Sequence, residues 1–237
     1  MPDSFVRALA SSPVALDVAV AREQHAAYVA GLLWLGLEVV RVEPDEDCPD
    51  CCFIEDTAVV AGGVALVSNP GALSRRGEVE PVARALAAHC RVLRTEAPAT
   101  FDGGDCLRAG GALLVGLSSR TNAAGVERLR QVFGRATGVP MPPGLLHLKS
   151  WCSPLDDDRA LAVEGLELPG VQVIRVPREE APASNVVAWR EAALMPPGAP
   201  RTRERLEAAG FRTLEVDTSE LRKADGALTC LSILLGQ

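Results

Sequence analysis

Apolar and polar positions follow two periods along the chain, and the changes between them mark the expected elements. Residues 15–36 carry apolar side chains at helical spacing among polar ones, and Gly36 ends this pattern ahead of LEVVRVEP, which predicts a strand. FIEDTAVV and VALVSNPG are two β-rich runs separated by Ala-Gly-Gly. Because glycine adopts the positive φ that a tight turn needs, these runs predict a hairpin, and a helix over about 75–89 follows.

The same order of elements returns in the next part of the chain. RVLRTEA predicts a strand, CLRAGGALLVGLS a hairpin that turns at Gly110 and Gly111, and residues 122–133 a helix. No Ser/Gly linker, charge block or low-complexity stretch divides the sequence, so we expect one α/β domain over residues 1–237. The recurrence of strand, hairpin and helix indicates an internal repeat.

Polar residues mark the starts of successive β-rich runs at a nearly constant interval of about 45 residues, so five units account for the chain. These landmarks are Glu55, Asp102, His147, Asn185 and Cys230. Five units closed into a ring would bring the start of each inner strand near a common axis, where the polar side chains would converge. An ordinary α/β sheet of recurring strand and helix units is the alternative explanation of the same pattern.

The identity of the polar residues favours the ring. Arg75 lies 20 residues after Glu55, at the start of an expected helix. Arg120 lies 18 residues after Asp102, again near a helix start, so a carboxylate and a guanidinium recur in register. Glu55 and Asp56 have a simple alternative role at a solvated strand end. If they converge with Asp102, they form an acidic pocket for a cation.

Composition and charge narrow the class of protein. Hydrophobic residues make up 48% and charged residues 23%, which excludes disordered, collagen-like and coiled-coil chains. Lys and Arg number 24 against 31 Asp and Glu, a net charge of -7 that argues against a nucleic-acid partner. No window approaches the roughly 18 to 20 apolar residues of a membrane span, and MPDSFVRALASSP has too short an apolar run for a signal peptide. We expect a cytoplasmic protein without a membrane partner.

The seven cysteines have irregular spacing, which suits reduced thiols better than a disulfide framework. Taken singly, Cys230 and His147 are explained as buried core residues. In equivalent repeat positions they would meet at the axis, where they can act as nucleophile and general acid/base. Cys48 and Cys51 have CxxC spacing but no second pair and no nearby histidine, and the glycine pairs lack the context of a phosphate loop. We therefore expect no metal site and no nucleotide cofactor.

Long stretches of the chain resemble the dimethylarginine dimethylaminohydrolases, a family of the guanidine-modifying pentein superfamily. The resemblance runs through DVAVAREQHAAYVAGLLWLGLEVV, PDCCFIEDTAVV, NPGALSRRGEVE, FDGGDCLRAGGALLVGLSSRTNAAGVE, GLLHLKSWCS and DTSELRKADGALTCLSILL, while PREEAPASNVVAWREAALMPPG matches only loosely. It implies the family's fold, a five-bladed α/β propeller of pseudo-fivefold ββαβ units (the pentein fold). The counted repeat agrees with this expectation.

The resemblance also implies roles for the reacting groups. Cys230 matches the family's nucleophile, which attacks the guanidinium carbon and forms a covalent adduct. His147 matches its acid/base partner, and Asp102 matches the acidic residue that orients or charges that histidine. An adjacent cation is expected to help ionise the thiol of Cys230.

The implied substrate contacts account for both ends of a free amino acid. Glu55 and Asp56 match substrate-binding carboxylates, of which the second binds the guanidinium nitrogens in the family. Arg75 and Arg120 match the residues that bind the substrate carboxylate. The remaining implied contacts are Asp50, for the α-amino group, and the backbones of Leu9, in an N-terminal lid, and Ala224, in the loop before the cysteine.

We therefore expect a cysteine hydrolase that converts Nω-methylated arginines to L-citrulline and dimethylamine or methylamine without a metal or cofactor, as a monomer or a homodimer. Zn²⁺ is expected only as an inhibitor that captures the thiolate of Cys230. Three alternatives stay open. One is another guanidine hydrolase of the superfamily, with a different pocket width. The others are an inactive arginine-binding or regulatory protein and a zinc-buffering or redox protein that uses the seven thiols.

Overall fold

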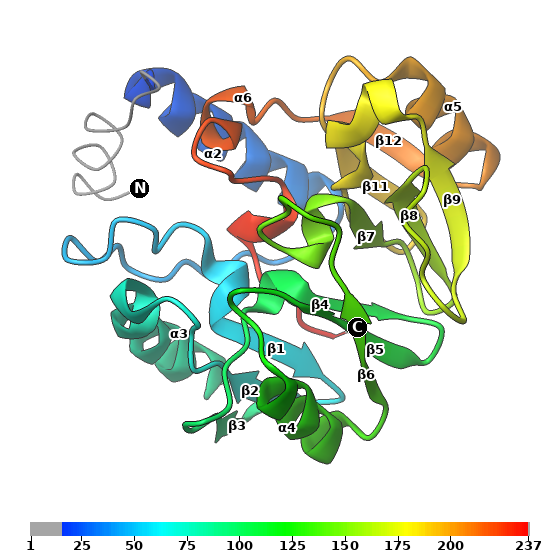
Figure 1. The fold of residues 1–237 in the computed structure, drawn as a ribbon. Coiled ribbons are helices and arrows are strands. Elements are labelled where there is room, and N and C mark those ends of the chain that lie inside the picture. The colour runs from blue at the N-terminus through cyan, green and yellow to red at the C-terminus, as the bar shows by residue number, and fades with distance from the viewer. Residues whose placement is uncertain (1–15, 237) are drawn as a thin grey trace.

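Four small sheets and an incomplete fifth unit surround a common centre in the computed structural model, which describes residues 16–236 (Figure 1). In each sheet an antiparallel hairpin is followed by a third strand that runs parallel to the second. The strands are β1 (Ala58–Ala61), β2 (Val64–Val67) and β3 (Arg91–Arg94); β4 (Cys106–Ala109), β5 (Ala112–Leu117) and β6 (Ala136–Pro140); β7 (Cys152–Pro154), β8 (Arg159–Val163) and β9 (Gln172–Val176); and β10 (Val187–Trp189), β11 (Ala192–Met195) and β12 (Arg212–Glu215).

Glycine pairs turn the first two hairpins, as the sequence predicts. Ala61 pairs with Val64 across the first hairpin, so Gly62 and Gly63 alone form the turn. Their φ values of 56° and 74° lie in the left-handed region that a two-residue type I′ turn requires at both positions. The equivalent glycines of the second hairpin also have positive φ.

Helices connect the second and third strands in three of the four sheets, and a loop over residues 164–171 does so in the third. The helices are α2 (Val18–Trp34), α3 (Val79–Leu86), α4 (Ala123–Phe133), α5 (Pro200–Ala208) and α6 (Ser219–Arg222). Asn122 caps α4 at the predicted start, because its side chain accepts a hydrogen bond of 2.8 Å from the backbone N–H of Gly125. Among the described residues, no helix has the length and apolar character needed to cross a membrane.

Each unit begins with a short 3₁₀ helix at the inner end of its first strand. These helices are η1 (Ile54–Thr57), η3 (Gly103–Asp105), η4 (Leu148–Ser150) and η5 (Arg178–Ser184), and η6 (Thr229–Leu231) holds the same place before residues 232–236. η1 contacts η3 and η6, and η3 contacts η4. The five predicted landmarks lie within or directly beside these five helices.

The fifth unit is assembled from segments far apart in the sequence. α2 lies beside α6, and the C-terminal segment enters the centre of the molecule after η6 (Figure 1). Ile233 and Leu235 pack on the core around β1 and β2, whereas Leu234 packs on the core below α2 and β11. The C-terminal segment therefore closes the ring between the fourth unit and the first, which confirms the predicted five-unit α/β architecture.

Two predicted strand segments have a different conformation. Residues 54–57 form η1 instead of extending β1, because a tight turn lets Glu55 and Asp56 both face inward, whereas a strand would place them on opposite faces. LEVVRVEP has no strand assignment. Its apolar side chains, Leu37, Val39 and Val42, pack against the hydrophobic core instead.

A 3₁₀ turn also replaces the start of one predicted helix. The helix expected over 75–89 begins as η2 (Leu73–Glu78) and continues as α3. The tighter turn orients Arg75 toward the interior, where it is buried.

Candidate active site

The 3₁₀ helices surround a cavity of about 350 Å³. Four of the five landmarks line it, namely Glu55, His147, Asn185 and Cys230. The fifth, Asp102, is fully buried and contacts His147. The predicted convergence of the landmarks is thus confirmed.

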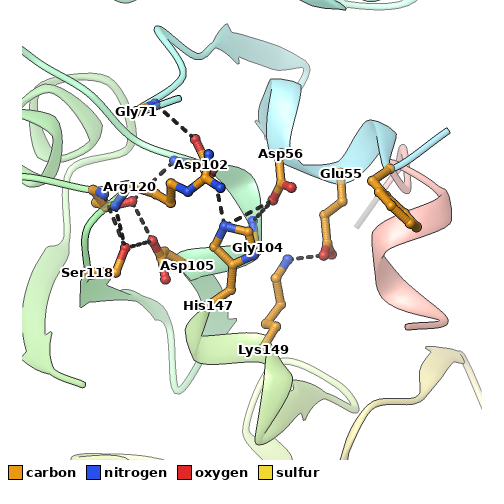
Figure 2. A network of polar contacts seen from close by, with 12 residues as sticks. Glu55, Asp56, Gly71, Asp102, Gly104, Asp105, Ser118, Arg120, His147 and Lys149 are labelled. Atoms are coloured by element: carbon orange, nitrogen blue, oxygen red, sulfur yellow. Dashed lines mark hydrogen bonds and ion pairs between the residues drawn. The ribbon is translucent and has the colours of Figure 1, made fainter. Parts of the chain in front are cut away.

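His147 lies between two buried carboxylates (Figure 2). Its Nε2 is 3.1 Å from Oδ2 of Asp102 and 3.8 Å from Oδ1 of Asp56. The other oxygen of Asp102 accepts a hydrogen bond of 3.2 Å from the backbone N–H of Gly71. Burial lowers the pKa of His147, but the charge of Asp56 and the hydrogen bond to Asp102 outweigh burial and raise it above its ordinary value. The site therefore favours an imidazolium.

Arg75 holds Asp56, the second of the two carboxylates beside His147. The guanidinium of Arg75 forms an ion pair with Asp56 through Nη1, and its Nη2 donates to Glu78 at 2.6 Å and to the carbonyl of Phe53 at 2.9 Å. Burial raises the pKa of Asp56, but the positive charges of His147 and Arg75 outweigh burial and lower it. Asp56 is therefore a carboxylate, and Arg75 is directed at Asp56 and Glu78.

Two glycines allow these groups to approach each other. A Cβ on Gly103 would lie 2.0 Å from the carbonyl oxygen of Glu55. A Cβ on Gly104 would lie 2.7 Å from Oδ1 of Asp56 and 2.8 Å from Cγ of His147. The Gly-Gly pair in FDGGD is thus required by close packing between η1, η3 and His147.

Glu55 belongs to a separate buried network on the other side of the cavity. Its Oε1 is 2.5 Å from Nζ of Lys149, and its Oε2 accepts a hydrogen bond of 2.8 Å from the hydroxyl of Thr229. Asn185 donates to that hydroxyl at 3.0 Å and to the carbonyl of Lys149 at 2.8 Å, and it accepts from the N–H of Thr229 at 3.0 Å. The network therefore fixes the residue directly before Cys230.

Sequence reasoning missed Lys149 and Thr229 as parts of the site. Both stand next to predicted residues, Lys149 two positions after His147 and Thr229 one before Cys230. Burial lowers the pKa of Lys149, but the charge of Glu55 outweighs burial and raises it, so Lys149 carries a positive charge. Glu55 and Lys149 also line a second cavity of about 540 Å³, so the ion pair stands between the two cavities.

Cys230 is half-buried within η6, facing the 350 Å³ cavity. Burial raises the pKa of its thiol well above the ordinary value, and the negative charges of Glu55 and Asp56 raise it further. The ring of the only tyrosine in the sequence, Tyr28, is buried behind it, with its hydroxyl 2.7 Å from the hydroxyl of Ser232. In the described site the thiol is therefore protonated at neutral pH, unless a cation enters.

The remaining predicted contacts among the described residues do not line the cavity that Cys230 faces. Arg120 extends toward Asp102 and His147 (Figure 2), and its Nη1 is buried without a hydrogen-bond partner among the described residues. Asp50 and Ala224 are both half-buried, the first in the turn before η1 and the second in the loop before Cys230. Asp50, Arg75, Arg120 and Ala224 do not line the 350 Å³ cavity, and Leu9 lies outside the described residues.

Asp56, Asp102 and His147 have the residue types and the spacing of a cation site. One ligand atom from each lies within 4.8 Å of the others. Yet Arg75 and Gly104 already engage the two oxygens of Asp56, and Gly71 engages one oxygen of Asp102. An imidazolium between two carboxylates fits this arrangement better than a divalent ion. Such an ion would be repelled by the positive charges of Arg75 and of the His147 imidazolium.

Comparisons with known proteins agree with this architecture, although no model of a protein family matches the chain. The chain is 37% identical to the N(G),N(G)-dimethylarginine dimethylaminohydrolase of Pseudomonas aeruginosa, over 97% of this chain and 94% of that protein. It is 40% identical to the protein of the same name in Streptomyces coelicolor, over 93% of this chain and 88% of that protein.

Solved structures show the same likeness. A cysteine-to-serine mutant of the Pseudomonas aeruginosa enzyme, complexed with citrulline, has a TM-score of 0.89 at 36% identity, covering 97% of this chain and 94% of that one. A histidine-to-glycine variant of dimethylarginine dimethylaminohydrolase, solved as an adduct with S-methyl-L-thiocitrulline, has a TM-score of 0.89 at 35% identity, covering 98% and 95%.

Proposed function

The chain belongs to the dimethylarginine dimethylaminohydrolase family, and we propose that it hydrolyses Nω-methylated arginines to L-citrulline and dimethylamine or methylamine. One observation carries the proposal for this chain: Cys230, His147 and Glu55 face one cavity, with Asp56 behind the histidine. This arrangement combines a nucleophile, an acid/base group and negative charge for a guanidinium. A volume of about 350 Å³ also suits a small ligand.

The proposed reaction has two halves, both centred on the guanidinium carbon. The sulfur of Cys230 attacks that carbon and forms a C–S bond, and the C–N bond to the alkylamine breaks as His147 donates a proton to the departing nitrogen. His147 then takes a proton from a water molecule, which attacks the same carbon. The C–S bond breaks with its electron pair on the sulfur, and the added hydroxyl gives its remaining proton to the released alkylamine through solvent. Citrulline leaves as a neutral urea, and the thiolate of Cys230 is restored.

Substrate binding supplies the charge that activates the thiol. A guanidinium in the cavity would offset the negative charges of Glu55 and Asp56, which raise the pKa of Cys230. The thiol then releases its proton to solvent, and the thiolate forms where its electrophile is already bound. This coupling favours cationic guanidines over neutral ureas such as citrulline, and so favours release of the product.

We assign the amino-acid end of the substrate to the remaining predicted contacts. Arg120 is suited to bind the carboxylate, because its buried Nη1 lacks a partner among the described residues. Arg75 would contribute from behind Asp56, to which it is already paired. The other proposed contacts are Asp50 for the α-amino group and the backbones of Ala224 and Leu9.

The proposed chemistry requires no metal or cofactor, because a thiol, an imidazole and water account for every bond made and broken. Zn²⁺ would inhibit by binding the Cys230 thiolate and the His147 imidazole, both preferred zinc ligands. We place the reaction in the cytoplasm, where reducing conditions suit the free thiols of the described residues. We propose that one domain comprising the whole chain performs it.

The proposal is tested by incubating the wild type, Cys230→Ser and Cys90→Ser with asymmetric dimethylarginine in the presence of a chelator. Citrulline and dimethylamine should form in equal amounts with wild type and Cys90→Ser, and neither should form with Cys230→Ser. Cys90 is a matched control, because it is also a free, half-buried thiol but lies in the turn between α3 and β3. Full turnover by Cys230→Ser, or citrulline from arginine alone, would overturn the proposal.

A further inference from the structure

A buried carboxylate that the proposed reaction does not use lies behind the acid/base histidine. Asp105 ends η3, is fully buried, and accepts three hydrogen bonds from two other segments of the chain. Its oxygens do not line the 350 Å³ cavity. Asp105 therefore contacts the segments that hold the reacting groups without contacting the space that the substrate would occupy.

One hydrogen bond ties Asp105 to the segment of the histidine. Its Oδ1 accepts from the backbone N–H of Leu148 at 3.0 Å. Leu148 directly follows His147 and begins η4, so this bond fixes the backbone from which the imidazole extends. Gly116 packs against the same place, since a Cβ there would lie 3.1 Å from Oδ1 of Asp105.

Two further hydrogen bonds tie Asp105 to the segment of the arginine. Its Oδ2 accepts from the hydroxyls of Ser118 and Thr121, each at 2.6 Å (Figure 2 shows the contact with Ser118). The hydroxyl of Ser118 in turn accepts from the backbone N–H of Arg120 at 2.9 Å. The hydroxyl of Thr121 accepts from the backbone N–H of Asp102 at 3.1 Å.

The direction of these bonds requires a carboxylate at this position. Both hydroxyls already accept from backbone N–H groups, so each has its proton free to donate to Asp105. An ionised carboxylate accepts all three donors, whereas an asparagine would direct its NH₂ either at the two hydroxyls or at the N–H of Leu148, and each of these needs an acceptor. Such a mismatch would shift the Ser118 and Thr121 segment or leave a buried donor unpaired.

We infer that Asp105 is a positioning residue that sets His147, Arg120 and Asp102 in register with one another. The inference rests on the proposed function, because it assigns the three residues their parts in one reaction. It adds that one buried carboxylate couples the acid/base group to the arginine that would bind the substrate carboxylate. Asp105 thereby fixes the distance between His147 and Arg120, and this distance must match the distance between the guanidinium and the carboxylate of the substrate.

Substitutions on the separate branches test the inference. Ser118→Ala removes the branch to Arg120, together with a 3.2 Å hydrogen bond from the backbone N–H of Thr121, and keeps the bond from Leu148 to Asp105. KM for asymmetric dimethylarginine should therefore rise roughly tenfold while kcat stays within about twofold. Asp105→Asn disturbs both branches, so kcat/KM should fall by roughly 10²-fold, through both a lower kcat and a higher KM. Asp156→Asn is the matched control, since Asp156 also accepts backbone hydrogen bonds but lies in an exposed turn.

A readout that needs no turnover separates this inference from the proposed function. Asp56, Asp102 and Asp105 are the negative groups that act on His147, and only the last is removed in Asp105→Asn. NMR titration, with the His147 signal assigned by its loss in His147→Gln, should show a lower imidazole pKa in Asp105→Asn than in wild type.

Inactivity of the wild type would overturn the proposed function alone. An unchanged imidazole pKa would overturn the positioning inference. So would Asp105→Asn and Ser118→Ala enzymes that have a lowered melting temperature but wild-type kcat and KM. If Asp105→Asn does not fold, the inference is tested with Ser118→Ala alone. A raised KM with a nearly unchanged kcat supports it, and an unchanged KM overturns it.

Discussion

His147 and Cys230 face the same cavity but are held by different physical means. His147 is buried between Asp102 and Asp56, which are themselves held by Gly71 and Arg75. Cys230 is half-buried, and its position depends on its neighbours, because Thr229 and Ser232 make the hydrogen bonds that fix η6 and the residues after it. Ion pairs order the proposed acid/base side of the site, whereas hydroxyl and amide hydrogen bonds, one of them to the carboxylate of Glu55, order the proposed nucleophile side.

This difference indicates when His147 and Cys230 each reach the protonation state that the proposed reaction needs. The imidazolium is stabilised by carboxylates that are in place before a ligand arrives. The same negative environment opposes ionisation of the thiol. In the proposed reaction a cationic ligand removes that opposition, so one set of charges would prepare the proposed acid and keep the proposed nucleophile inactive in the empty site.

Removal of the His147 imidazole should have the largest effect on turnover, since the buried carboxylates around it are arranged to hold that group. His147→Gln is expected to lower kcat by roughly 10²- to 10⁴-fold, the usual contribution of general acid/base catalysis. Steady-state kinetics with asymmetric dimethylarginine measure this loss. The control is His89→Gln, because His89 is exposed and distant in sequence from the site. A loss below about threefold in His147→Gln would contradict the proposed role.

Thr229→Val tests how the nucleophile side is held, and it should have the next largest effect. The substitution keeps the shape of the side chain but leaves an oxygen of Glu55 and an N–H of Asn185 without their partner. Because one of these bonds is to a charged group, the free energy of unfolding should fall by about 1.5–3 kcal/mol. Urea unfolding measures this change, and Thr229→Ser, which keeps the hydroxyl, should stay close to wild type. Equal stabilities of the Val and Ser variants would contradict the network.

The polar landmarks were predictable from the sequence because a repeat assigns one such residue to each unit. Asp102 and His147 begin η3 and η4, so counting along the chain found positions that are equivalent in space. The local hairpins were predictable for a similar reason, since the glycine turns depend on residues adjacent in the sequence.

The pairings between units were not predictable, because ring closure determines them. Lys149 meets Glu55 across 94 positions in the sequence, and a lysine after a histidine gives no signal of a buried ion pair. The family resemblance assigned Arg75 to the substrate carboxylate, but no signal in the sequence indicated that Asp56 and Glu78 are its charged partners in the structure. Such contacts depend on how closely the 3₁₀ helices approach one another, and periodicity does not report that distance.

Alkylation of the Cys230 thiol tests the electrostatic part of the comparison between the two sides. Its rate should rise about tenfold in Glu55→Gln relative to wild type. Burial, Glu55 and Asp56 raise the pKa of Cys230, so in wild type its thiolate fraction at pH 7.5 is small and rises with pH. Glu55→Gln removes one negative charge and leaves Lys149 unpaired nearby, and both changes lower the pKa. A shift of one unit gives about ten times more thiolate at a pH below the pKa.

Iodoacetamide labelling of Cys230, followed by mass spectrometry of its peptide, measures that change. The labelling of Cys90 in the same sample corrects for differences in reagent and pH, since burial, and not the charge of Glu55, is the cause of its own raised pKa. Slower labelling of Cys230 in Glu55→Gln than in wild type would show that the carboxylate does not suppress ionisation.

The smallest expected effect concerns Tyr28, which supports the nucleophile side from behind. Its hydroxyl bonds the hydroxyl of Ser232, two positions after Cys230, so Tyr28→Phe should lower the free energy of unfolding by about 1 kcal/mol. Since the pKa of the phenol is raised by burial, its hydroxyl is neutral, and kcat should stay within about twofold.

Ser232→Ala and the double variant Tyr28→Phe/Ser232→Ala complete a double-mutant cycle. The double variant should lose less than the sum of the two single losses, because both remove the same bond. Additive losses would place the stabilising contact of Tyr28 elsewhere, and a large fall in kcat would mean that neutral contacts, as well as charge, set the reactivity of the thiol.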